Sequence, residues 1–175
     1  MLRTIALVVV AVIAGIAIFA ATKPDTFRVE RSTTIKAPPA KVFALIDDFK
    51  RWEAWSPWEK KDPAMKRSYG PVTSGKGAHY AWEGNSDVGQ GSMDIVDSTP
   101  PSKVTLNLDF VKPFEGHNVV DFTVTPKGDT TAVTWSMAGP APFISKVMQV
   151  FVDMDRMVGK DFESGLANLK AAAEK

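Results

Sequence analysis

Residues 103–138 read KVTLNLDFVKPFEGHNVVDFTVTPKGDTTAVTWSMA, and this stretch decides the fold class. Apolar and polar side chains alternate in three runs, at 103–111, 117–126 and 130–138. Alternation places every second side chain on the same face of a strand. Gly, Pro and Asp fill the breaks between the runs, and Gly128-Asp129 is short enough for a tight hairpin. The stretch therefore predicts an antiparallel meander with one apolar and one wet face.

Further strand-like runs lie upstream of this stretch, at 65–69, 77–83 and 90–98. Residues 27–35 also alternate, and their polar content is typical of an edge strand. Between them, 40–49 forms an amphipathic helical pattern after Pro39, and Trp52 to Trp58 predicts a second short helical turn. The body is thus expected to run from one strand through two short helices into six strands.

A long helical pattern follows from Phe143 to Lys170. Its apolar residues recur every three or four positions, at Ile144, Val147, Phe151, Met154, Val158, Phe162, Leu166 and Leu169. Charged residues between them are expected on the exposed side, at Lys146, Asp153, Arg156, Lys160 and Glu163. The pattern predicts one helix roughly 40 Å long that covers the apolar face of the sheet.

The first 22 residues differ from the rest of the chain. An unbroken apolar run from Ile5 to Ala21 covers most of a ~30 Å hydrocarbon layer. A cleaved signal peptide would need small residues at −3, where Ile18 or Phe19 would stand. We therefore predict a signal anchor at 1–22, a linker at 23–26 and one domain at 27–175, with the domain on the exported side.

Composition excludes several functional classes. The 175 residues carry a net charge of +1, which offers no clustered positive footprint for a nucleic acid. The chain has no cysteine and two histidines, so thiolate chemistry and a Cys-ligated metal are excluded, and a zinc site is not expected. No cofactor is predicted, and the oligomeric state is left open.

The order of elements resembles the helix-grip fold of the START-like superfamily, the polyketide cyclase/dehydrase and lipid-transport group. The resemblance is carried by VERSTTI at 29–35, APPAKVF at 37–43 and WEAWSPW at 52–58, as in bacterial members. It extends over about 27–173 and implies an α+β domain, with a curved antiparallel sheet around a long C-terminal helix. It also implies a cavity between the sheet and that helix.

Ten side chains are expected to line this cavity: Tyr80, Trp82, Leu106, Phe110, Phe122, Trp135, Met137, Phe151, Met154 and Val158. Leu108 is placed in the solid part of the core, and His79 on the face opposite Tyr80 and Trp82. Ordinary core packing explains the same residues equally well.

Binding of a lipid or other hydrophobic small molecule is the function favoured by these residues, with the membrane as a second partner. A cyclase- or dehydratase-like enzyme needs a positioned acid or base, for which Tyr80 and, less well, Asp94 are the candidates. A protein-interaction module would instead show Trp55 and Trp58 as an exposed patch.

Overall fold

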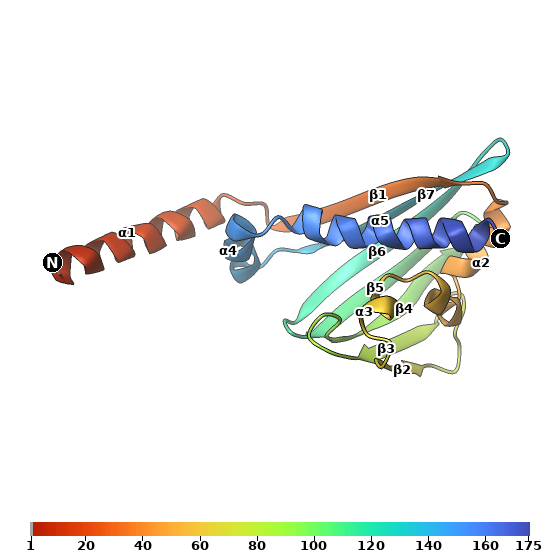
Figure 1. Cartoon of the computed structure of the whole chain (residues 1–175), viewed down its shortest axis with the longest axis horizontal. Helices are drawn as coiled ribbons and strands as arrows, with labels where there is room; N and C mark the ends of the chain where they lie inside the picture. Colours follow the sequence, from red (N-terminus) through yellow and green to blue (C-terminus); the bar gives the residue numbers. More distant parts are fainter. Residues whose placement is uncertain (1) are drawn as a thin grey trace.

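The computed structural model describes residues 2–175 and confirms the α+β architecture, with a curved antiparallel sheet gripping a C-terminal helix (Figure 1). The seven-stranded sheet has the order β1-β7-β6-β5-β4-β3-β2, so every neighbour except β1–β7 is also consecutive in sequence. The strands are β1 (Thr26–Ile35), β2 (Lys66–Tyr69), β3 (His79–Glu83), β4 (Gln90–Thr99), β5 (Lys103–Lys112), β6 (Gly116–Lys127) and β7 (Thr130–Pro140).

The predicted apolar face is the core face. Val104 and Leu106 of β5, with Phe122 of β6 and Trp135 of β7, are almost completely buried. Gly128 turns the β6–β7 hairpin with a φ of 60°, a conformation that favours glycine because it has no Cβ. The meander predicted from alternation is therefore present, with each strand within two residues of its expected bounds.

Helix α5 (Met154–Ala173) lies across the concave face of the sheet (Figure 1). It buries Phe162, Leu166 and Leu169. Gly165 permits the close approach, since a Cβ at this position would lie 2.7 Å from the Trp135 ring and 3.1 Å from Pro57. Burial of these side chains at about 25 cal/mol per Å² makes α5 the main cover of the core.

The prediction of one continuous helix over 143–170 is wrong. The chain forms α4 (Phe143–Phe151), leaves the helix at Val152 with φ −124° and ψ 124°, and restarts as α5. Asp153 caps the new helix, its carboxylate accepting a hydrogen bond from the Arg156 amide at 3.0 Å. An aspartate offers the backbone a local alternative to continued helix, which is why the break falls there.

Lys146 was expected on the exposed side of this helix and is instead only 8% exposed. Its ammonium is paired with the carboxylate of Asp25 in the segment before β1. Helix α4 thus has its one charged side chain toward the body and its apolar side outward.

Three short helical segments connect β1 to β2: α2 (Pro39–Ile46), the 3-10 helix η1 (Phe49–Ala54) and α3 (Trp58–Lys61). Their tryptophans point inward. The Trp52 indole donates to the Ile46 carbonyl at 2.8 Å, and Trp55 donates to Leu45 at 2.9 Å. Trp55 is buried and Trp58 half-buried, so they do not form the exposed patch that an interaction module would show.

At the other end of the chain, α1 (Leu2–Ala21) extends away from the body along the long axis of the molecule (Figure 1). Its residues Arg3–Ala21 are strongly apolar, and almost all of this segment is exposed. The helix is long and apolar enough to span a membrane, and a signal sequence has the same properties.

Candidate functional site

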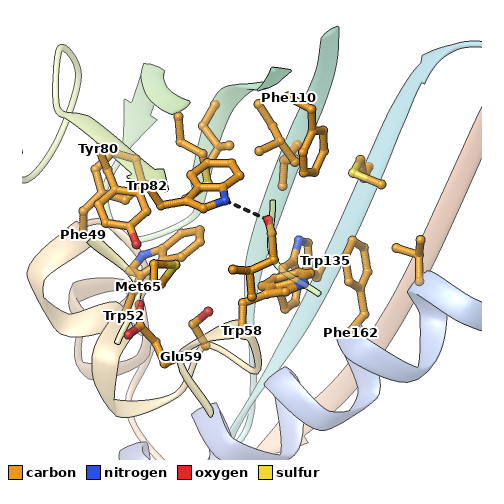
Figure 2. A pocket seen from close by; sticks show the side chains of 18 residues that line it. Phe49, Trp52, Trp58, Glu59, Met65, Tyr80, Trp82, Phe110, Trp135 and Phe162 are labelled. Atoms are coloured by element: carbon orange, nitrogen blue, oxygen red, sulfur yellow. Dashed lines mark hydrogen bonds between the residues drawn. The ribbon is translucent and has the colours of Figure 1, made fainter. Parts of the chain in front are cut away.

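A cavity of about 120 Å³ lies between α5, the segment η1–α3 and the concave face of the sheet. Figure 2 shows aromatic side chains from both sides converging on it. Phe49, Trp52 and Trp58 come from the helical segment, while Tyr80 and Trp82 come from β3. Apolar atoms make up most of the wall because each contributing strand presents its core face here.

The structure places most of the predicted site residues around this one cavity. Seven of them line it: Tyr80, Trp82, Leu106, Phe110, Trp135, Met137 and Val158. They come from β3, β5, β7 and α5, which are far apart in sequence. Strand alternation identified the six strand residues, because the lining is the same face of the sheet that forms the core, and the helical repeat identified Val158.

Three of the predicted residues do not line the cavity. Phe122 is completely buried between Trp55 and Trp135, with ring centroids at 6.0 and 4.9 Å. Phe151 lies on α4 and is 69% exposed. Met154 begins α5, beside a surface groove that α4 forms with the start of β1. The helix break at Val152 takes Phe151 out of register with the stripe along α5, whereas Met154 stays in register with Val158 but lies one turn before it.

Other lining residues were missed by the sequence argument. Leu108 borders the cavity instead of the solid core, and Phe49, Trp52, Trp58 and Glu59 form the wall opposite the sheet. The tract from Trp52 to Trp58 is a visible aromatic signal. Its 3-10 and single-turn helices have no sustained period, however, so the sequence does not show which of their sides faces inward.

Aromatic contacts hold the wall together. Trp135 stacks on Phe162 with ring centroids 4.1 Å apart and planes 9° from parallel. Trp58 meets the same indole edge-on at 5.8 Å, and Trp82 meets Phe110 edge-on at 5.8 Å. Such ring pairs contribute about 0.5–1.5 kcal/mol beyond their buried area. The cavity is therefore bounded by a mutually supported aromatic frame.

One polar atom of this frame has no partner. Trp135 is 2% exposed, and its Nε1–H has no hydrogen-bond acceptor within residues 2–175. The lining indole of Trp82, by contrast, donates to the Val88 carbonyl at 2.9 Å, the dashed line in Figure 2. A buried donor without an acceptor costs about 1–3 kcal/mol. The aromatic frame around the cavity thus contains one buried donor that is unused.

Tyr80 is the inward polar tip that the sequence suggested. Burial raises the pKa of its hydroxyl well above the ordinary value, so the group stays neutral across the physiological range. Asp94 lies on the opposite face of the sheet, where its carboxylate is 2.7 Å from Nδ1 of His79. The expectation that His79 points away from Tyr80 is therefore confirmed, and Asp94 lies outside the cavity.

Glu59 brings a carboxylate to the rim. Arg67 donates to it from Nε at 2.9 Å and from a second guanidinium nitrogen, and both side chains are mostly buried. Hydrogen bonding to Glu59 raises the pKa of Arg67. No group of three or more His, Asp or Glu side chains within the described residues could hold a metal ion.

Comparison with known proteins agrees with this geometry. Residues 26–174 match the family model described as polyketide cyclase / dehydrase and lipid transport. Ginseng major latex-like protein 151 from Panax ginseng is 18% identical, with a TM-score of 0.60 over 87% of this chain and 100% of its own. Protein CV1439 from Chromobacterium violaceum is 14% identical, with a TM-score of 0.60 over 87% and 99%.

The Aha1 dimer from Colwellia psychrerythraea is 15% identical, with a TM-score of 0.61 over 85% of this chain and 96% of its own. At these identities the solved structures establish the helix-grip fold alone. No curated protein matches the sequence significantly.

Proposed function

The chain belongs to the polyketide cyclase / dehydrase and lipid transport family, and from this membership we propose that it binds a lipid or other hydrophobic small molecule beneath α5. The observation that carries the proposal is the apolar cavity walled by Trp135, whose indole donor is unused. A ligand with an apolar body and one hydrogen-bond acceptor satisfies both features. The aromatic frame would contact the body, and Trp135 would donate to the acceptor.

The size of the cavity bears on the ligand. At about 120 Å³ it is comparable to a ~150 Å³ engineered cavity that admits benzene. This volume accommodates one small ring or a short stretch of acyl chain. A larger ligand would insert one end and leave the remainder outside, or displace the single-turn helix α3, which short loops join to η1 and β2.

Binding is favoured over catalysis by the state of the polar groups. An efficient general acid or base titrates near the working pH. The pKa of Tyr80 is moved by burial away from neutrality, and the Glu59 carboxylate is already engaged by Arg67. A cyclase- or dehydratase-like activity is the alternative suggested by the family description, and Tyr80 would be its acid.

We further propose that α1 is an uncleaved membrane anchor. Its apolar run is longer than a usual signal core, and bulky Ile18 and Phe19 stand where a signal peptidase requires small residues. The arrangement is then an anchor at 1–22, a linker at 23–26 and a domain at 27–175. We place that domain on the exported side of the membrane.

A photocrosslinking experiment tests the ligand proposal. Full-length protein is reconstituted in lipid nanodiscs containing a fatty acid with a diazirine on its acyl chain, and crosslinked peptides are mapped by mass spectrometry. We expect crosslinks at cavity residues such as Met93 and Met137. Val158→Trp, which fills the lining from α5, should reduce their yield roughly tenfold, the effect of losing about 1.4 kcal/mol of binding.

Lys160→Trp is the matched control, because it adds the same side chain to an exposed position of the same helix. It should leave the crosslinks at Met93 and Met137 unchanged. If the wild-type chain gives no crosslinks at these residues, or if both variants lose them equally, the cavity does not bind acyl chains.

A further inference from the structure

We propose that one end of the domain docks on the lipid surface, with α4 lying in the interface and the cavity mouth facing the bilayer. The inference rests on the proposed anchor and ligand cavity and adds a specific docking surface to them. It names the membrane as the source of the ligand, so that the ligand enters without crossing water.

The strand register defines the end in question, which we call the proximal end. Thr26 at the start of β1 pairs with Pro140 at the end of β7, and Phe110 near the end of β5 pairs with Gly116 at the start of β6. Helix α1 leads into this end, and α4 leaves from it (Figure 1). The proximal end is thus the end of the sheet next to the proposed membrane anchor.

Exposed large apolar side chains gather at the proximal end. Phe114 lies in the β5–β6 turn and is 63% exposed, and Ile144 on α4 is 63% exposed. Phe143, Phe151 and Val152 are exposed beside Ile144. Outside α1, only Val72 and Val96 are comparably exposed away from this end within the described residues. A concentration of this kind on one end marks an interaction surface.

Helix α4 has its charged side chain buried and its apolar side exposed, which is the reverse of a helix on a water-facing surface. Its one charged side chain, Lys146, is buried against the body and paired with Asp25, while Phe143, Ile144 and Phe151 face outward. Each large apolar side chain left in water forgoes the favourable free energy of its burial. Contact with the acyl boundary of a bilayer recovers this energy, as it does for interfacial amphipathic helices.

The short connection to α1 limits how far α4 can lie from the membrane surface. The Ala141 amide donates to the Asp25 carbonyl at 2.7 Å, and Lys146 pairs with the Asp25 side chain. Asp25 lies four residues beyond the last residue of α1, so at ~3.5 Å per residue it lies within about 14 Å of the end of that helix. A spanning α1 therefore keeps α4 close to the headgroup and acyl boundary.

The cavity opens in the same direction. Its half-exposed lining residues are Leu108, Phe110, Val158, Trp82, Trp58 and Glu59, whereas Leu106 and Trp135 are buried. Phe110 pairs with Gly116 and Leu108 with Asn118, which places both near the proximal end. Trp82 lies beside them, because its partner Gly91 pairs with Phe110. The half-exposed strand side chains thus line a mouth toward the end that carries the apolar surface, with Trp58 and Glu59 of α3 as further half-exposed lining residues.

Site-specific quenching tests the docking directly, because the chain has no cysteine to interfere with labelling. Single cysteines are placed at Ile144 and Phe114, labelled with an environment-sensitive fluorophore, and the full-length protein is reconstituted in nanodiscs with nitroxide-labelled lipids. Val72→Cys, an exposed apolar position away from the proximal end, is the control. Val10→Cys in α1 reports whether the anchor is embedded.

We expect labels at Ile144 and Phe114 to be quenched roughly threefold more than the label at Val72, as for side chains at an interface. Equal quenching at the three sites, with Val10 strongly quenched, would overturn the docking and leave the anchor intact. Labels shielded from water but not quenched by the lipid would mean that a second copy covers this end, which also overturns it.

Failure of the proposed function has a different signature. An unquenched label at Val10 means that α1 is not embedded, and the docking fails with the anchor. Loss of the diazirine crosslinks at Met137, with quenching retained at Ile144, means that the domain docks but binds no acyl chain. Docking and ligand binding are therefore decided by separate readouts.

Discussion

At the scale of single residues, the tryptophans divide into two kinds. Trp52, Trp55 and Trp82 each donate to a backbone carbonyl, so they complete the hydrogen bonding of the core. Trp135 does not donate to any acceptor in the described residues, although it is as buried as Trp52 and Trp55. Buried polar groups are almost always paired, so the unpaired donor of Trp135 is an exception within the aromatic frame around the cavity.

Replacing these indoles with phenyl rings should separate the two kinds. Trp55→Phe removes the donor to Leu45 and leaves that carbonyl unpaired, whereas Trp135→Phe removes a donor that has no partner. We expect both variants to have a lower free energy of unfolding than the wild type. The loss in Trp55→Phe should exceed the loss in Trp135→Phe by about 1–3 kcal/mol. Urea denaturation of the full-length chain in detergent measures the difference, and equal losses would contradict the assignment.

At the scale of elements, the N-terminal part of α5 is held to β1 by a charge cluster. Arg31 donates to both carboxylate oxygens of Asp155 at 3.0 Å and to Glu163 at 2.8 Å. Gly159 makes room for the guanidinium, which a Cβ would approach to 2.0 Å. The cluster positions the helix that carries Val158 and Phe162, so it supports the cavity wall.

This cluster should make stability depend on pH in the acid range. Hydrogen bonding to Arg31 lowers the pKa of Asp155 below its ordinary value of 3.8. A lowered folded-state pKa contributes stability above the unfolded value of ~3.9, and the contribution is lost as pH falls through the folded pKa.

Asp155→Asn should therefore be less stable than the wild type at pH 6, and the gap should narrow as the pH falls below 3.8. Thermal unfolding of both proteins between pH 6 and 3 provides the measurement. Asp87→Asn, in an exposed turn outside the cluster, should show no comparable gap. A gap that is independent of pH would exclude a charge contribution from Asp155.

At the scale of the whole molecule, α1 and the body have opposite solvent preferences. We expect the full-length protein to remain with membranes after alkaline and high-salt washes, because its apolar run of 5–21 partitions strongly into lipid. Val9→Arg with Ile13→Arg should release it, since each central arginine costs about 2.5–3.5 kcal/mol. If intact-mass measurement shows a mature chain that begins near Thr22, the segment is a cleaved signal peptide and the anchor is contradicted.

The fold was accessible from sequence because its information is local. Strand alternation in 103–138 identified the core face of β5, β6 and β7, and the same alternation placed Tyr80 and Trp82 opposite His79. Turn residues such as Gly128 marked the hairpins. These features depend on the two-residue period of a strand. That period is visible in the local sequence without information from the rest of the chain.

The tertiary structure alone decided the features that depend on which partner covers an element. The apolar stripe of 143–170 predicted one helix facing the core. In the structure, α4 instead has Lys146 buried beside Asp25 and its apolar side outward, and the cap at Asp153 separates it from α5. For the same reason, the sequence did not show that Trp52 and Trp58 form part of the cavity wall. Periodicity shows which side of an element is apolar. Whether that side meets a protein core, a ligand or a membrane is set by contacts between segments distant in the chain.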